Sequence, residues 1–272
     1  MTGAAGLIGS RVRSGLARRY EVVGVDKTAS SPEEDAVAPV DLTEYGQVRS
    51  ALEGSDALVH LAIASERALS RMDAHAYAAE EVRANVLGTR NVFEAAAEAG
   101  VRRVVFMSSL TVYMGSPALA RVTPDTPLQP RNHYSITKLY GEQLAWWYAA
   151  NERFGCVCWR LGQPYPVEHF GLEHLRDPAA RSCAISTDDI GRGIFAGLEA
   201  ELPADGRGGL PTGFRATPGH VVANLVSASD VGPAYGYDLA AAKALGYFPG
   251  DCFTANGPIP HNPETHDSEP AA

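Results

Sequence analysis

The feature that most constrains this chain is the alternation of continuous apolar segments with segments of helical spacing. The clearest apolar segment, VRRVVFMSS at 101–109, is β-branched along its length and ends in polar residues. Similar segments lie at 21–26, 56–65 and 156–162, and helical spacing marks 8–20, 72–99 and 134–153. Strands that are apolar on both faces need helices on both faces, as parallel sheets have. The pattern predicts an α/β fold with a doubly wound parallel sheet.

Composition excludes several other classes of protein. With 45% apolar and 20% charged residues among 272, the chain has an ordinary globular composition. Its 32 acidic residues outnumber 23 basic ones, and a net charge of −9 disfavours nucleic acid as a partner. No apolar run reaches about 18 residues, so no membrane partner is expected.

The cysteines and histidines give no sign of a disulfide framework or a metal site. Cys156 and Cys158 flank one residue of an apolar strand, which is not metal-ligand spacing, so we expect buried thiols. The eight histidines are scattered, and no metal is expected. Residues 1–10 lack the features of a signal peptide, so the expected location is cytoplasmic.

A glycine-rich turn at the N-terminus indicates a dinucleotide site. Gly3, Gly6 and Gly9 open a helix, where a pyrophosphate can approach the backbone and the helix N-terminus favours an anion. Asp26 ends the next strand, 17 residues after Gly9, where a carboxylate can hold both hydroxyls of an adenosine ribose. It would repel a 2′-phosphate, which favours NAD over NADP, although Lys27 leaves NADP possible.

Asp41 and Leu42 end the third predicted strand. They could hold an adenine, with the carboxylate accepting from the amino group and the leucine covering the ring. An ordinary acidic residue in a loop is the alternative for Asp41.

The turn is unusual because it follows Met1 directly, whereas a glycine turn of this kind normally follows a buried strand. We therefore expect the first, central strand to be missing and the natural protein to carry roughly 5–15 further residues, the length of a strand with its lead-in.

Ser109, Tyr134 and Lys138 form a candidate catalytic set. Tyr134 and Lys138 are four residues apart and share one face of a predicted helix. Ser109 ends the 101–109 strand, and sites in parallel sheets form outside such carboxyl ends. A nearby ammonium would stabilise a tyrosine phenolate, making Tyr134 a base for an alcohol proton while Ser109 holds the substrate oxygen. A surface pair is the alternative for Tyr134 and Lys138 considered alone.

Together these motifs resemble the extended class of the short-chain dehydrogenase/reductase superfamily, the NAD-dependent epimerase/dehydratase family. The matching segments are TGAAGLIG at 2–9, Asp26, Asp41-Leu42, HLA at 60–62, NVLGT at 85–89, SSLTVY at 108–113, YSITK at 134–138 and RLGQPYP at 160–166. The resemblance implies a Rossmann-type fold that binds NAD and an enzyme that moves a hydride between NAD and a hydroxyl group.

The resemblance also implies roles for further residues. Leu7 and Ile8 would join the three glycines at the pyrophosphate, and Leu61 and Ala62 would line the nicotinamide side. Asn85 would brace the loops behind the active site. Ser109, Tyr134 and Lys138 would be catalytic, with Tyr134 and Lys138 also contacting the cofactor.

Differences between this sequence and the family pattern indicate which reaction of the family to expect. Sugar-nucleotide dehydratases of the family carry an acid pair directly after the serine, whereas this chain has Leu110 and Thr111. The short C-terminal region and the segments ISTDDI and LGYFPGD resemble uronate dehydrogenase-like sugar dehydrogenases. We therefore expect an NAD-dependent dehydrogenase for a sugar or sugar acid. A sugar-nucleotide epimerase and a non-catalytic NAD-binding redox sensor are the alternatives.

Four residues are candidates for contact with the substrate. Thr111 and Gln163 stand where uronate dehydrogenases have other polar residues. Arg176 or Arg181 could bind a carboxylate, since a guanidinium binds two oxygens at once; a surface arginine is the alternative for each.

The expected organisation is an NAD-binding domain over 1–162, a small substrate-binding lobe over 163–253 that is interleaved with the sheet, and a mobile acidic tail over 254–272. The helix after Tyr134 carries more apolar surface than one buried face needs, which favours a homodimer; a fully buried helix is the alternative. The apolar residues are Leu139, Tyr140, Leu144, Trp146, Trp147 and Tyr148.

Overall fold

A computed structural model of the chain describes residues 1–28, 37–64, 72–115, 121–165, 171–202, 207–208, 217–231 and 236–261. Its helices are α1 (Gly9–Leu16), α2 (Tyr45–Leu52), α4 (Ala74–Glu81), η1 (Val82–Leu87), α5 (Gly88–Glu98), η2 (Leu110–Tyr113), α6 (His133–Ala150), η3 (His174–Arg176), α7 (Pro178–Cys183), α8 (Thr187–Glu199) and α9 (Ala240–Ala244). Its first strands are β1 (Gly24–Asp26), β2 (Val37–Pro39), β3 (Ala57–His60), β4 (Arg103–Ser109), β5 (Arg121–Val122), β6 (Gly155–Leu161) and β7 (Gln163–Tyr165). The later strands are β8 (Ala184–Ser186), β9 (Arg207–Gly208), β10 (His220–Leu225), β11 (Ala228–Ser229), β12 (Gly236–Tyr237), β13 (Asp251–Thr254) and β14 (Gly257–Pro260).

A parallel sheet forms the centre of the molecule, as predicted. Strands β3, β4, β6, β10 and β9 lie side by side in that order, and every pairing among them is parallel. The longest ladder joins β4 to β6, from the Arg103–Gly155 pair to the Ser109–Leu161 pair. Both strands are apolar on both faces and are buried between layers of helices, which explains their continuous hydrophobic sequence.

The sheet continues to β1 and β2 through Thr2. This residue forms parallel bridges to Val25 of β1 and His60 of β3. Its N–H donates to the Val59 carbonyl at 3.0 Å, and its own carbonyl accepts from Leu61 N–H at 3.3 Å. Met1 and Thr2 thus lie between β1 and β3, where the expected central strand belongs.

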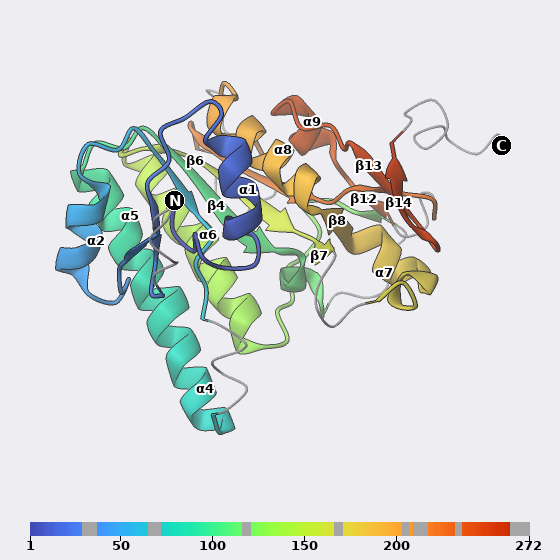
Figure 1. Ribbon diagram of the computed structural model, residues 1–272, viewed down its shortest axis with the longest axis horizontal. Helices are drawn as coiled ribbons and strands as arrows, with labels where there is room; N and C mark the ends of the chain where they lie inside the picture. Colours follow the sequence, from blue (N-terminus) through green and yellow to red (C-terminus); the bar gives the residue numbers. More distant parts are fainter. Residues whose placement is uncertain are drawn as a thin grey trace.

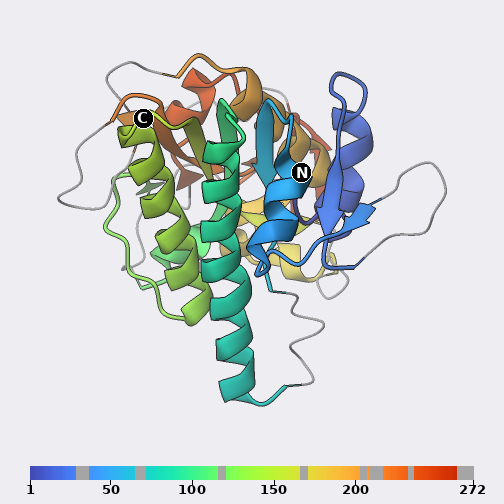
Figure 2. The same cartoon turned by 90° about the vertical axis from the view of Figure 1, so that its left-hand side faces the viewer.

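Helices cover both faces of the sheet, so the fold is the predicted Rossmann-type doubly wound α/β fold (Figure 1). On one face α2, α5 and α6 enclose a core that includes Phe93 and Phe106. On the other face α1, α8 and α9 enclose a core around Trp159. Figure 2 shows α5 and α6 side by side on the outer layer, with α4 extending beyond the body of the molecule.

The C-terminal part forms a small lobe at one end of the sheet, near β13, β14 and α7 (Figure 1). This part of the chain includes β7 and α7, and β7 pairs with β8 in parallel. Pro178 is compatible with α7 because it occupies the first helical turn, where its missing N–H is not needed.

The expected tail over 254–272 is placed too early. Residues 251–260 form the antiparallel hairpin of β13 and β14, and Cys252 and Phe253 are completely buried. These buried side chains belong to β13, and β14, which lies inside the expected tail, is held to β13 by the antiparallel ladder. The remainder of the expected tail, from residue 262, lies outside the described residues.

Candidate active site

The glycine turn has the close backbone packing that a dinucleotide site needs. Gly3 has a φ of +68°, and a β-carbon there would lie 2.7 Å from the Ala62 nitrogen. A β-carbon on Gly9 would lie 2.1 Å from the Gly3 carbonyl oxygen. Both positions therefore exclude larger residues, because the turn packs backbone against backbone on the loop after β3 and on the start of α1.

The predicted ribose ligand stands beside this turn. Asp26 is the last residue of β1, and its carboxylate accepts from Ala5 N–H at 3.1 Å and from Thr28 N–H at 3.3 Å. Ala5 lies inside the glycine turn, so the hydrogen bond ties the carboxylate to the candidate pyrophosphate loop. The Asp26 carboxylate therefore lies next to the glycine turn, as the predicted ribose site requires.

Asp41 is already engaged by protein groups. Thr43 donates to its carboxylate from both its N–H and its hydroxyl, and Lys27 Nζ lies 3.5 Å away. The Thr43 backbone hydrogen bond is the main cause that lowers the pKa of Asp41. Leu42 lies beside it and packs on the core next to α5, while its carbonyl accepts from Asn91.

Lys138 is buried at the centre of the candidate catalytic set. Its Nζ donates to the Met107 carbonyl at 2.7 Å and lies 5.6 Å from the centre of the Tyr134 ring. Burial lowers the pKa of Lys138 to about 7, against the opposing effect of the Glu142 carboxylate. The spacing of four residues thus places Tyr134 and Lys138 together, as the sequence predicted.

Ser109 ends β4 and begins η2. Its Oγ accepts from Thr111 N–H at 3.2 Å and from the Thr111 hydroxyl at 3.1 Å. Because both hydrogen bonds use the serine oxygen as acceptor, the serine hydrogen can be donated to a substrate. The Ser135 hydroxyl donates to the Thr111 carbonyl at 3.1 Å, which holds this segment against the first turn of α6.

Asn85 connects two parts of the site. It lies in η1, a π-helical turn between α4 and α5, and its side chain is buried. Its carbonyl oxygen accepts from Ala64 N–H at 2.7 Å, and its amide donates to Thr137 at 3.2 Å. Thr137 donates in turn to the Tyr134 carbonyl. Asn85 therefore connects the loop after β3 to α6.

The candidate substrate residues divide into two groups. Gln163 is half-buried in β7, and Arg176 is exposed on η3. Arg181 is held inside the lobe: its Nε lies 2.7 Å from Asp230, and an Nη atom donates to the Leu175 carbonyl. Thr111 donates to Ser109. Arg181 and Thr111 thus have structural partners of their own.

A buried ion pair beside this set was missed by the sequence reasoning. Glu142 and Arg160 are joined by two hydrogen bonds, of 2.8 and 2.9 Å, and both are almost completely buried. Glu142 follows Lys138 by four residues, so its place on the same helical face could have been inferred. Arg160 gave no comparable signal within its apolar strand.

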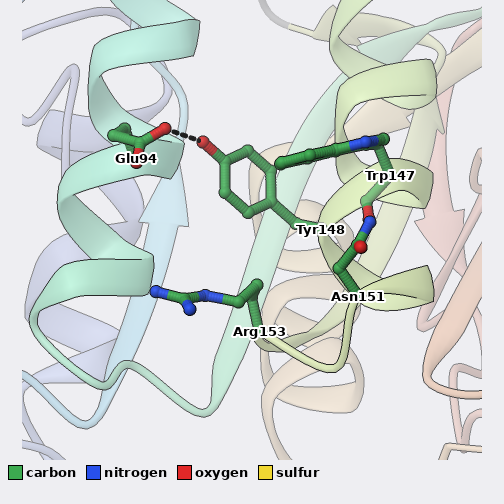
Figure 3. A pocket seen from close by; sticks show the side chains of 5 residues that line it. All are labelled: Glu94, Trp147, Tyr148, Asn151 and Arg153. Carbon is green, nitrogen blue, oxygen red and sulfur yellow. Dashed lines mark hydrogen bonds between the residues drawn. The ribbon is translucent and has the colours of Figure 1, made fainter.

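Two surface hollows have linings that include none of the candidate catalytic residues. Glu94, Trp147, Tyr148, Asn151 and Arg153 line a surface hollow of about 330 Å³, where Tyr148 donates to Glu94 between α5 and α6 (Figure 3). A second hollow of about 400 Å³ lies near Phe154 and Gly219. No group of His, Cys, Asp and Glu in the described ranges could hold a metal ion. Within these ranges no helix has the length and apolar character needed to cross a membrane.

A parallel sheet with a glycine turn, a strand-end aspartate and a Ser–Tyr–Lys set defines a dinucleotide-dependent enzyme. A sequence profile described as the NAD dependent epimerase/dehydratase family matches residues 1–182, more than half of the chain. The protein belongs to this family and is an enzyme with NAD as its cofactor.

Curated relatives cover most of the chain. A uronate dehydrogenase of Pseudomonas putida is 29% identical over 92% of this chain and 83% of its own length. An L-arabinose 1-dehydrogenase (NAD(P)(+)) of Haloferax volcanii is 27% identical over 92% of this chain and 95% of its own length.

A solved structure shows the same fold. The uronate dehydrogenase of Agrobacterium tumefaciens matches with a TM-score of 0.70 and 26% identity, over 92% of this chain and 83% of that one. A variant of the A. tumefaciens enzyme, solved in complex with NAD, matches equally well. The fold and cofactor predictions are therefore confirmed.

Proposed function

We propose that the protein is an NAD-dependent dehydrogenase that oxidises a hydroxyl group of a sugar or sugar acid. The observation that carries this proposal is the extent of the similarity: both the uronate and the arabinose dehydrogenase match over 92% of the chain. The matched length therefore includes most of the C-terminal lobe, whereas the family profile ends within it, at residue 182. A sugar, rather than a sugar nucleotide, is consistent with the small size of this lobe.

The site supplies the groups for such a reaction. NAD supplies the acceptor for the hydride that leaves the substrate carbon. Tyr134 takes the hydroxyl proton as the carbonyl group forms, and Ser109 donates its hydrogen to the same substrate oxygen. Lys138 stabilises the tyrosine phenolate when its ammonium is protonated. The glycine turn and Asp26 hold the cofactor, with Leu7, Ile8, Leu61 and Ala62 around it.

We propose that two of the four candidate residues contact the substrate. Gln163 and Arg176 are the candidates for direct contact, because Arg181 and Thr111 are engaged by Asp230 and Ser109. An arginine contact would favour an acidic sugar, since its fork binds a carboxylate at two points. Arg176→Gln should then raise the KM for a uronate more than the KM for a neutral aldose.

NADH formation with a panel of aldoses, uronic acids, sugar phosphates and sugar nucleotides tests the function. We expect turnover of a free sugar or uronate, and a loss of about 10²–10⁴-fold in kcat/KM for Tyr134→Phe. Tyr140→Phe is the matched control, since Tyr140 lies on the same helix and is absent from the set. No NADH with any member, together with interconversion of a sugar nucleotide, would overturn the proposal in favour of an epimerase.

We also propose that the enzyme is a homodimer. Ile136 and Trp147 of α6 are 53% and 50% exposed, and Val82 and Leu87 of the neighbouring η1 are also exposed. Such an apolar surface on two adjacent helices is typical of an interface. Sedimentation should give a dimer mass that Trp147→Lys reduces, and a monomeric wild type would exclude this assembly.

The expected cytoplasmic location is likewise a proposal. All four cysteines are free, and Cys156, Cys158 and Cys252 are buried, which suits a reducing compartment. Fractionation of the source cells should place the activity with the cytoplasmic marker enzymes.

A further inference from the structure

A buried polar network lies behind the candidate catalytic residues. Glu142 receives two hydrogen bonds from Arg160 and a third, of 2.6 Å, from the Ser108 hydroxyl. Ser108 directly precedes Ser109, and Glu142 follows Lys138 by one helical turn. The carboxylate therefore connects the end of β4 to the face of α6 that carries Lys138.

Arg160 extends the network to the opposite side. One of its Nη atoms donates to the Tyr113 hydroxyl at 2.6 Å and to the Pro124 carbonyl at 2.8 Å. The Tyr113 hydroxyl also lies 3.1 Å from the Thr123 carbonyl and from the Asn224 side chain. One guanidinium thus joins β6, α6, η2 and the segment 121–126.

Asn224 completes the connection to the lobe. It is completely buried in β10, and its amide donates to the carbonyls of Val122 and Asp238 at 3.2 Å. Val122 belongs to β5, which pairs with β12. The polar chain therefore runs from the catalytic helix to the small sheet of β5 and β12.

The protonation states of Arg160 and Tyr113 in this network are fixed by their surroundings. Burial alone would lower the pKa of Arg160, but the Glu142 carboxylate and the Tyr113 hydroxyl raise it above its usual value. Burial raises the pKa of Tyr113 to about 12, although Arg160 opposes the shift. Arg160 stays charged and the Tyr113 phenol stays protonated at any working pH, so the network keeps one arrangement.

We propose that Glu142, Arg160 and Tyr113 are positioning residues that fix the substrate-side segments 110–113 and 121–126 against the catalytic helix α6. The proposal rests on the proposed dehydrogenase function. It assigns different effects to the two ends of the network. The Glu142 end sets Ser109 and Lys138, which act on the reacting oxygen, so it governs kcat. The Tyr113 end holds the loops that follow Ser109, so it governs the KM for the sugar.

A solely structural ion pair would behave differently. It would change stability while leaving the kinetic constants of the folded enzyme alone. A positioning pair shifts the kinetic constants of folded enzyme, because hydrogen bonds to a misplaced substrate are lost. The two interpretations therefore predict different values of kcat and KM when these are measured well below the unfolding temperature.

Tyr113→Phe is the central test. It deletes the hydroxyl that joins Arg160 to Thr123 and Asn224 but keeps the ring and the Glu142–Arg160 pair. We expect the sugar KM to rise about tenfold, the effect of one hydrogen bond to a charged group, with kcat within about twofold and NAD affinity unchanged. Glu142→Gln should show the opposite division, a fall in kcat of about tenfold with a smaller change in KM.

Tyr148→Phe is the matched control. Tyr148 is also buried and donates to a carboxylate, Glu94, but it lies at the far end of α6 between that helix and α5. Its loss should lower stability without raising the sugar KM. An unchanged sugar KM in Tyr113→Phe, or an equal rise in Tyr148→Phe, would overturn the proposal.

Hydrogen exchange separates failure of this proposal from failure of the proposed function. Wild-type protein that oxidises no sugar contradicts the function alone. The amides of 121–126 should still exchange faster in Tyr113→Phe than in wild type, and remain at the wild-type rate in Tyr148→Phe. Unchanged exchange across 121–126 in Tyr113→Phe would overturn the positioning role, whether or not a substrate is found.

Discussion

The two sides of the candidate site are held together in different ways. On the catalytic side, β4 and β6 share a ladder that runs along their full length, and the Glu142–Arg160 pair is buried beneath it. On the cofactor side, Met1 and Thr2 connect β1 to β3 through backbone bonds, and Thr2 alone forms bridges to both strands. The charged contacts of the cofactor side, such as that between Lys27 and Asp41, are partly exposed to solvent.

This difference shows where geometry is fixed most firmly. Ser109 ends β4, which a long backbone ladder joins to β6, and the desolvated ion pair joins β6 to α6, which carries Tyr134 and Lys138. The groups proposed to hold the adenosine lie at the end of β1 and just after β2, and these strands reach the rest of the sheet through few backbone bonds. We expect mutations on the catalytic side to have larger effects on stability, and the following predictions test that order.

The largest effect is expected from breaking the buried ion pair. Arg160→Met leaves the Glu142 carboxylate buried without its charged partner, and such changes cost about 3–5 kcal/mol. Urea unfolding measures the loss. Arg102→Met is the control, because Arg102 and its partner Asp56 are 82% and 85% exposed and such pairs contribute at most about 1 kcal/mol. Similar losses for the two variants would contradict the large contribution assigned to the buried pair on the catalytic side.

A smaller effect is expected from protonating His60, which joins the two regions. Burial, followed by Lys138 and the N-terminal ammonium, lowers the pKa of His60 to about 3 from 6.5. Between these values the unfolded chain binds a proton that the folded protein does not. Stability therefore falls as the pH drops below 6.5, by about 1.4 kcal/mol per pH unit for this group.

The comparison of wild type with His60→Gln isolates this contribution. The variant lacks the titrating ring, so its unfolding free energy should fall less steeply between pH 6 and pH 4.5. Thermal or urea unfolding across that range measures both slopes. Parallel slopes would show that His60 is protonated in the folded protein.

How far the sequence predicted the site depended on the distance between partners along the chain. Tyr134 and Lys138 are one helical turn apart, so their proximity followed from helix geometry alone. Asp26 could be placed because it ends an apolar strand just after the glycine turn. Each of these inferences needed only one element and its direction.

Partners from distant elements could not be paired from one sequence. Glu142 and Arg160 come from α6 and β6, and their contact depends on how that helix crosses the sheet. Arg181 looked free for a substrate because Asp230, its partner, lies in a separate segment of the lobe. The hairpin of β13 and β14 was missed because its burial depends on packing near η3 and α7.

The Thr2 hydroxyl is the next test of the junction between the regions. It lies 2.6 Å from His60 Nδ1, and both groups are buried. Thr2→Val keeps the shape of the side chain but leaves the imidazole nitrogen without this partner, at a cost of about 1–3 kcal/mol. Thr28→Val, at an exposed position, should change the unfolding free energy by less than about 0.5 kcal/mol. Equal losses of unfolding free energy in the two variants would show that the Thr2 hydroxyl does not stabilise the junction between the two regions.

The smallest effect concerns the cofactor side alone. Asp26→Asn removes the charge proposed to select a free ribose over a 2′-phosphate, while the glycine turn that binds the pyrophosphate is kept. The ratio of the Kd values for NADP and NAD should fall about tenfold, or about 1.4 kcal/mol.

This ratio is the informative measurement because both cofactors share every other contact. If loss of the Ala5 hydrogen bond loosens the turn, the binding of NAD and of NADP weakens equally, and the ratio of their Kd values does not change. Asp41→Asn is the matched control, since Thr43 and Lys27 already engage that carboxylate and its charge lies farther along the adenosine. An unchanged ratio in Asp26→Asn would show that the charge of Asp26 does not set the preference for NAD. A change confined to this ratio would show that the loosely joined region governs the choice of cofactor, while the firmly held region governs the chemistry.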